Sequence, residues 1–148
     1  MKDIRIYSPQ DQDAVKQFII DILQEFDFDY DPVDDYDLDD LAGSYMSDKA
    51  ILYVLKEQEN IIGTVAVRNK GNGVAEIKRL FLHQLYRGQG WGSRLLDLAL
   101  DFCLRAGYRK IVLDTEKRLR RSQELYLSRD FVITDTLGDT IYMSKDLY

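Results

Sequence analysis

The segment YRGQGWG, residues 86–92, places three glycines within five positions, between an apolar run and a helical pattern. A glycine-rich turn between a strand and a helix exposes several backbone N–H groups at one place, and the helix adds the positive end of its dipole. Glycine also lacks the Cβ that would hold a ligand away from the backbone. This turn is therefore a candidate pocket for phosphate or another anion.

Three phosphate-binding patterns can be compared with the turn. A P-loop is excluded, because it requires a Lys directly after its last glycine and none is present. A dinucleotide fingerprint would begin at Gly88 and Gly90 but has Ser93 in its sixth position. Asp114, about twenty residues further on, keeps that alternative open, although antiparallel hairpins rather than a parallel βαβ opening precede the turn. The pattern R-x-x-G-x-G is met in full by residues 87–92.

The apolar residues predict the elements that position this turn, since a period of two indicates strands and a period near 3.6 indicates helices. The expected order is β-α-α-β-β-β-α-β-α-β-β, with a right-handed βαβ unit around the glycines. Strands are expected at residues 3–8, three times within 50–82, and at 110–115, 131–136 and 141–147; helices are expected at 9–26, 37–47, 91–107 and 118–129.

This order predicts an α/β (α+β) fold with a single domain over residues 1–148. Its centre is a mixed, mostly antiparallel, twisted sheet of about seven strands, flanked by about four helices. The run from Lys78 to Leu82 cannot keep a two-residue period, so we expect a β-bulge at Arg79–Phe81. The strand at 110–115 is a continuous apolar run, which is typical of a strand buried on both faces.

Composition and charge exclude several classes of protein. Hydrophobic residues make up 45% and charged residues 31% of the chain, as in ordinary soluble domains. The first residues do not form a signal peptide, and the longest apolar run, Ala50–Leu55, is too short for a bilayer. We therefore expect a cytoplasmic protein without a membrane partner. One Cys and one His leave no disulfide framework and no usual zinc ligand set, so no metal is expected.

Residues 27–40 hold eight Asp and no Lys or Arg, which accounts for the net charge of −6. The segment begins like a calcium loop, but Pro32 and Leu38 stand where that loop needs Gly and Glu, so calcium binding is excluded. An acidic chain without a basic, aromatic-lined face also argues against a nucleic-acid partner.

The segment EIKRLFLHQLYRGQGWGSRLL, residues 76–96, resembles the acetyl-CoA-binding segment of the GNAT-type N-acetyltransferases. The likeness extends over nearly the whole chain, because the order of elements in that family matches the order given above. It implies that the pantetheine arm of coenzyme A pairs with the bulged strand and that the glycine turn binds the diphosphate. The implied cofactor-binding residues are Leu80, Phe81, Leu82, Arg87, Gly88, Gln89, Gly90, Trp91, Gly92 and Ser93.

Acetyl transfer to an amine needs proton transfer at both ends of the reaction. A lysine-like amine with a pKa near 10.4 is neutral in about one part in a thousand or less at pH 7, so a base is required. The segment RSQELYLSRDF, residues 121–131, resembles the family motif in which a tyrosine protonates the departing thiolate, and Tyr126 takes that position. Glu76 stands where many members carry a glutamate base. A solvated strand residue that pairs with Lys78 or an arginine is the alternative role for Glu76, and a water relay could replace it as the base. A plain packing role remains the alternative for Tyr126.

The chain departs from this later motif at three positions. Leu119 replaces a common Asn, Ser122 a common Ala and Asp130 a common Gly. Asp130 is compatible with a left-handed backbone, whereas Leu119 removes a polar side chain that is often near the cofactor. His83 is expected to be a turn residue, and Cys103 is expected to pack in the core.

In the family, the acidic segment flanks the acceptor pocket. The candidate substrate-binding residues are Phe28, Tyr30, Asp34, Asp35 and Tyr36, which would attract a polycationic or lysine-like acceptor through charge and ring faces. A solvated acidic loop is the alternative. The basic run KRLRR, residues 117–121, either attracts the phosphates of coenzyme A or forms the solvent-exposed face of a helix.

The resemblance implies an acetyl-CoA-dependent N-acetyltransferase that acts on a primary amine of a small molecule or peptide by direct attack in a ternary complex. An acyl-CoA-binding regulatory or interaction module on the same fold, without turnover, is the rival hypothesis. The two closing strands are a candidate homodimer contact, which the sequence does not decide.

Overall fold

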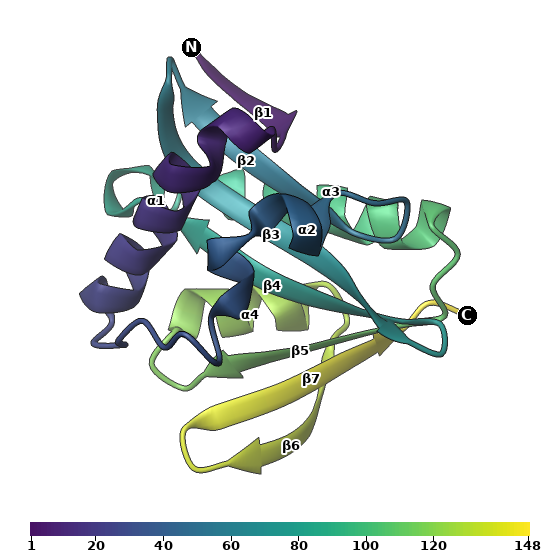
Figure 1. Cartoon of the computed structure of the whole chain (residues 1–148). Coiled ribbons are helices and arrows are strands. Elements are labelled where there is room, and N and C mark those ends of the chain that lie inside the picture. Colours follow the sequence, from purple (N-terminus) through teal and green to yellow (C-terminus); the bar gives the residue numbers. More distant parts are fainter.

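The computed structural model describes residues 1–148, and its elements follow the predicted order (Figure 1). None of its helices is long and apolar enough to span a membrane. The strands are β1 (Lys2–Ile6), β2 (Ile51–Glu57), β3 (Asn60–Gly71), β4 (Val74–Leu82), β5 (Lys110–Glu116), β6 (Val132–Leu137) and β7 (Thr140–Asp146), and the α-helices are α1 (Gln12–Glu25), α2 (Leu41–Tyr45), α3 (Trp91–Arg105) and α4 (Arg120–Ser128).

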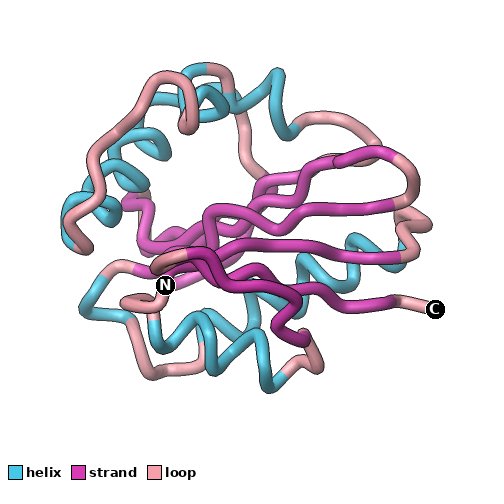
Figure 2. The backbone as a smooth tube through the Cα atoms, turned by 90° about the horizontal axis from the view of Figure 1, so that it is seen from below, coloured by secondary structure: helices cyan, strands magenta, loops and turns pink.

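All the strands form one seven-stranded sheet in the order β1-β2-β3-β4-β5-β7-β6. Neighbouring strands are antiparallel except β4 and β5, which are parallel. Helices cover both faces of the sheet (Figure 2): α1 and α2 pack on one face, and α3 and α4 pack on the other. The predicted mixed, mostly antiparallel sheet in a single α/β domain is confirmed.

Each face of the sheet carries its own apolar core, because the helices bury residues at a spacing of three and four. On the first face, α1 buries Val15, Phe18, Ile19 and Ile22. On the other, α3 buries Leu95, Leu96, Ala99 and Cys103, and α4 adds Tyr126. Cys103 is therefore a core residue, as expected, and burial raises the pKa of its thiol to about 12.

The parallel pair β4 and β5 is held together over a very short length. Val74–Glu76 pairs with Lys110–Val112, and no pairing follows. Beyond this point the two strands diverge (Figure 1). The edge of β4 from Ile77 to Leu82 therefore has no strand neighbour on the side of β5, and its backbone groups on that side are free for another partner.

This divergence makes one sequence prediction wrong. The strand β5 was expected to be buried on both faces, but only Ile111, Leu113 and Thr115 are buried. Asp114 between them is exposed, because β4 has already turned away at that level. The apolar run therefore packs one face of β5 on the core and turns the other toward the gap between the strands.

The predicted bulge is present at Arg79. This residue has a φ of 58°, and the register of β4 against β3 shifts between Thr64 and Ala66. The Thr64 hydroxyl donates a hydrogen bond to the Arg79 carbonyl at 2.7 Å and so fixes the bulge from the neighbouring strand. A positive φ is uncommon for a residue with a Cβ, so the surrounding contacts must hold it.

The side chain of Arg79 connects the bulge to the acidic segment. Its guanidinium is buried and contacts Asp37 at 2.7 and 3.1 Å and Asp35 at 2.9 Å. The Tyr45 hydroxyl donates a further hydrogen bond to Asp37 at 2.6 Å. Burial alone would raise the pKa of Asp37, but the bonds and charge of Arg79, together with Tyr45, outweigh it and hold that pKa below its usual value. Part of the acidic segment is therefore structural.

We expect Asp37→Ala to lower the free energy of unfolding by about 3 kcal/mol, because it leaves a buried guanidinium without its bidentate partner. Urea denaturation at pH 7 measures this loss. Asp39→Ala is the control, since Asp39 is an exposed residue that pairs with Lys16. It should lower the free energy of unfolding by much less. Equal stabilities of the two variants would contradict a structural role for Asp37.

The same variant has a predictable dependence on pH. A carboxylate whose pKa is lowered by folding stabilises the protein above its unfolded pKa of about 3.9 and loses this contribution as the pH falls through its lower folded pKa. The difference in stability between the wild type and Asp37→Ala should therefore be full at neutral pH and shrink in strong acid.

Candidate active site

The glycine turn presents an uninterrupted row of free backbone donors. No N–H group from Gly88 to Ser93 has an acceptor within the protein, and the first bond into this turn runs from the Arg94 N–H to the Gly90 carbonyl at 3.2 Å. Gly88 and Gly90 have φ values of 77° and 89°, which only glycine adopts readily. The expected concentration of unpaired donors at the start of α3 is therefore present.

Gly92, the third glycine, has a different reason to be there. It lies inside the first turn of α3 and has no positive φ. A Cβ at this position would lie 3.5 Å from a Leu125 methyl group and 3.6 Å from a Leu82 methyl group, which are ordinary contacts. Neither the backbone nor the packing requires a glycine at this position, so its absent side chain leaves space in the cavity that it lines.

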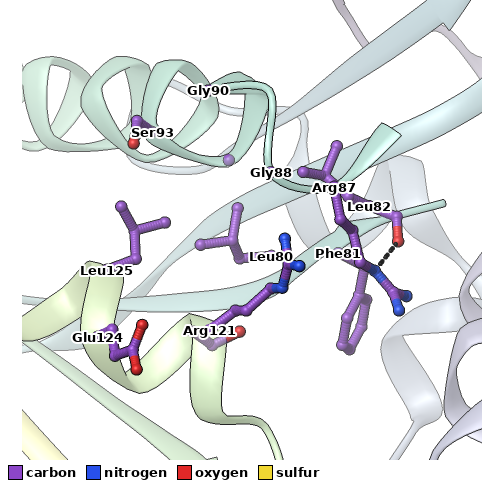
Figure 3. Close-up of a pocket in the computed structure, with 12 residues that line it drawn as sticks. Leu80, Phe81, Leu82, Arg87, Gly88, Gly90, Ser93, Arg121, Glu124 and Leu125 are labelled. Carbon is purple, nitrogen blue, oxygen red and sulfur yellow. Dashed lines mark hydrogen bonds between the residues drawn. The ribbon is translucent and has the colours of Figure 1, made fainter. Parts of the chain in front are cut away.

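A cavity of about 380 Å³ adjoins the turn. Figure 3 shows its three walls: the end of β4, the glycine turn with the start of α3, and the start of α4. Since Arg121, Glu124 and Leu125 are three and four residues apart, α4 presents them on one side, toward this cavity.

A second and larger cavity, of about 730 Å³, lies on the side of α1 and the acidic segment. Its floor includes Arg68, Glu76 and Lys78. These alternate along β3 and β4 with Val67 and Ile77, which belong to the core on the α3 side, so they point to the α1 face.

The two cavities meet at three residues. Leu80, Phe81 and Ser122 line both of them. These residues lie where the free edge of β4 faces α4 across the gap left by β5. A ligand that extends from the smaller cavity along this edge would therefore reach a ligand in the larger cavity at this junction.

Tyr126 lies on the adjoining side of α4 and lines the larger cavity. Its ring is buried and packs edge-on against Phe131, with the ring centres 5.6 Å apart. Its hydroxyl makes no hydrogen bond, yet no fully buried side-chain oxygen or nitrogen lacks a partner, so the hydroxyl borders the cavity. Burial, and then the negative charge of Asp114, raise the pKa of this phenol, so it keeps its proton at neutral pH.

Two carboxylates lie in the larger cavity near the point where β4 and β5 separate. Glu76 forms an ion pair with Arg68, whose guanidinium also donates to the Tyr36 hydroxyl at 2.9 Å. Asp114 has neither a hydrogen bond nor an ion pair through its carboxylate. Water reaches Asp114 in the cavity, but the surrounding protein removes part of its hydration. This desolvation, and then the negative charge of Glu76, raise its pKa above the usual range, although nearby lysines and Arg79 oppose the shift.

The residues expected from the sequence fall into two groups. Of the expected cofactor residues, all but Gln89 and Trp91 line the smaller cavity. The Gln89 side chain donates to the Leu85 carbonyl at 3.3 Å, and the Trp91 ring is covered by Arg94 at 4.5 Å, so these two residues offer only their backbone N–H groups.

Of the expected acceptor residues, Phe28, Asp34 and Asp35 line the larger cavity. Tyr30 lies away from it and donates to Asp39 at 2.6 Å. Tyr36 is outside the lining as well, and it supports the Arg68–Glu76 pair.

Comparison with known proteins agrees with this geometry. The model of the "Acetyltransferase (GNAT) family" matches residues 16–131. The chain belongs to the GNAT acetyltransferase family. It is 33% identical to an uncharacterised N-acetyltransferase of Schizosaccharomyces pombe over 148 aligned residues, which cover 94% of this chain and 90% of that protein. It spans about half the length of the other curated relatives that it matches.

Solved structures show the same fold. An acetyltransferase of the GNAT family from Staphylococcus aureus Mu50 superposes with a TM-score of 0.90 over 100% of both chains at 22% identity. The PaiA N-acetyltransferase of Thermoplasma acidophilum, solved in complex with coenzyme A, has a TM-score of 0.79 over 99% of both chains at 17% identity. The GNAT fold implied by the resemblance is thus confirmed.

The sequence did not indicate that three further residues, Asp114, Ser122 and Arg121, line the cavities. Asp114 was noted only as part of a dinucleotide pattern, although an acid that ends an apolar strand is a signal by itself. Ser122 was recorded as a departure from Ala, yet it lies where the cavities meet and its hydroxyl has no partner. Arg121 was one of five residues in a basic run, and nothing in the run distinguishes it.

We expect Gly92→Ala to raise the melting temperature and to weaken ligand binding. Alanine in a helix is more stable than glycine by up to about 1 kcal/mol, and the new methyl group would enter the cavity. Thermal unfolding without ligand and calorimetric titration with coenzyme A measure the two effects. Gly107→Ala is the control that should lower stability and spare binding, because Gly107 has a φ of 84° and lies beyond the far end of α3. Unchanged affinity in Gly92→Ala would contradict the assigned role.

Proposed function

We propose that this protein transfers the acetyl group of acetyl-CoA to a primary amine of a small molecule or peptide, by direct attack within a ternary complex. The single observation that supports this most is the row of free N–H groups from Gly88 to Ser93, placed beside the unpaired edge of β4. One feature suits a diphosphate and the other suits an extended amide-containing arm, and coenzyme A has both in that order. PaiA, which shares the fold, was solved with coenzyme A.

The residues present fit this ligand. The N–H groups of the turn and the dipole of α3 would hold the diphosphate, and the space left by Gly92 lets it approach. Leu80, Phe81 and Leu82 would hold the pantetheine arm along β4. When bound, acetyl-CoA supplies a thioester carbon to the junction of the cavities, where an amine can attack it.

Asp114 is the best-placed proton acceptor for the incoming amine. Its carboxylate is free of partners, lies in the larger cavity and has a raised pKa, which makes it a stronger base than an ordinary aspartate. Glu76, the base expected from the resemblance, is already bound to Arg68. We therefore assign proton removal to Asp114, directly or through water. Glu76 would hold Arg68 in place, and its negative charge raises the pKa of Asp114.

Tyr126 would protonate the leaving thiolate. As the new C–N bond forms and the C–S bond breaks, the amine proton passes to Asp114 and the Tyr126 proton passes to sulfur, and solvent then restores both groups. The raised pKa of Tyr126 keeps it in the protonated state that this role needs. Asp29 and Asp34 have no ion pair and place negative charge at the larger cavity. This charge would favour lysine-like or polycationic acceptor amines.

Tyr126→Phe should lower the rate of acetyl transfer by about a hundredfold and leave the affinity for coenzyme A within about twofold, because only the hydroxyl is lost. Thiol release from acetyl-CoA with a panel of polyamines, aminoglycosides, amino acids and peptides first identifies an acceptor for the wild type. Calorimetry measures cofactor binding. Equal transfer rates would remove Tyr126 from the mechanism. Tight cofactor binding without turnover on any amine would favour a regulatory acyl-CoA-binding module.

Asp114→Asn should lower kcat/KM by about a hundredfold and abolish the acidic limb of its pH profile. A base must be deprotonated to act, so activity falls as the pH drops through the pKa of Asp114, which lies above the usual value of about 3.9. Glu76→Gln is the matched comparison and should keep the acidic limb. If Glu76→Gln loses the limb while Asp114→Asn keeps it, then Glu76 is the base.

A further inference from the structure

The arginine of the R-x-x-G-x-G pattern offers little free charge to a phosphate. Arg87 donates to Glu25 at 2.9 Å and to the Leu82 carbonyl at 3.0 Å, and its guanidinium lies 5.2 Å from the Phe26 ring centre. Figure 3 shows its side chain directed at Leu82, away from α4. Arg87 therefore fixes the glycine turn to β4 and α1, and the positive charge for a diphosphate must come from another residue.

Arg121 supplies a free guanidinium at the same place. It makes no hydrogen bond and no ion pair within the protein, and it lines the smaller cavity. A Cβ built on Gly88 would lie 3.0 Å from one of its terminal nitrogens, so the guanidinium rests against the glycine turn. Figure 3 shows this side chain reaching from α4 toward the turn. A planar fork of donors matches phosphate oxygens well.

Glu124 limits where an anion can lie. It is on the same side of α4, three residues after Arg121, but its carboxylate is not within ion-pair distance of Arg121, although both line the cavity. A diphosphate near Glu124 would be repelled. The favourable position is therefore at the other end of the cavity, between the Arg121 guanidinium and the N–H groups that begin at Gly88.

An anion in that position would touch two helices at once. The start of α3 would bind it with N–H groups, and α4 would bind it through Arg121. Within α4 only Tyr126 is buried, and Gln123 ties the helix to the carbonyls of Glu116 and Lys117 at 2.9 and 2.8 Å. Few contacts therefore hold the start of α4 to the rest of the protein. A bridging diphosphate would add a contact at Arg121, five residues before Tyr126.

We propose that Arg121 is the ligand of the cofactor diphosphate on the α4 side, and that this contact positions the helix that carries Tyr126. This inference depends on the proposed binding of coenzyme A. It makes Arg121 a positioning residue as well as a binding residue, because cofactor binding would restrain α4 before the acceptor arrives.

Calorimetric titration of the full chain with coenzyme A and with 3′-dephospho-coenzyme A tests the contact. Arg121→Gln should weaken both ligands by about tenfold or more, which is the loss expected for a charged hydrogen-bonded contact. Lys117→Gln is the matched control, because it removes the same charge from the same basic run but lines neither cavity. It should change both affinities by less than about twofold.

Hydrogen exchange tests the effect on α4. Saturation with coenzyme A should protect the amides of residues 122–128 in the wild type and in Lys117→Gln, but not in Arg121→Gln. Equal affinities for the wild type and Arg121→Gln, or equal protection of α4, would overturn the proposal. A loss confined to coenzyme A and absent with the dephospho form would also overturn it, since Arg121 would then bind the 3′-phosphate. Absence of binding to the wild type would instead defeat the proposed function itself.

Discussion

The site depends on the early separation of β4 and β5. Two parallel strands that continued to pair would bind each other's backbone N–H and C=O groups, and none of these groups would be free for a ligand. Here pairing ends after Glu76 and Val112, and β4 continues past its bulge at Arg79 with β3 as its only strand neighbour. The free edge, the junction of the two cavities and the exposure of Asp114 all follow from this separation. The backbone groups left without a strand are those that an extended ligand can use.

The bulge is held by charge as well as by backbone bonds. Arg79 has an uncommon φ, and its guanidinium is buried against Asp35 and Asp37, so the backbone and the acidic segment stabilise each other's position. Asp29 and Asp34 of the same segment have no such partner and line the larger cavity. The concentration of aspartates in the sequence thus combines two physical roles, because buried carboxylates must be paired whereas exposed ones can act on a ligand.

Much of the fold was predictable because local patterns and the fold agree. The order of elements, the bulge, the end of α3 before Gly107 and the left-handed Asp130, with a φ of 68°, were all expected from residue types and spacing. The glycine turn was predictable too, since glycine at positive φ and a helix start are local properties.

What could not be predicted depends on contacts between segments that are distant in the sequence. An apolar run such as residues 110–115 does not show that its neighbouring strand turns away. No local signal shows that Arg87 is bound by Glu25 while Arg121, in a run of similar residues, is free. The pairing of Glu76 is a nearer contact, because Arg68 lies eight residues before it on β3 and opposite it in the sheet. The open position of Asp114, in contrast, depends on where β4 and β5 separate.

The smaller cavity lies beside the glycine turn and the larger one beside α1 and the acidic segment, and they share the lining residues Leu80, Phe81 and Ser122. In an acetyltransferase of this design, the spent thiol and the acetylated amine would have separate ways out, so neither product must wait for the other. A bulky acceptor in the larger cavity would also leave the nucleotide end of the donor in place, because the glycine turn lines only the smaller of these two cavities. The amine of a large peptide could therefore reach the thioester at the same junction of the two cavities as a small amine.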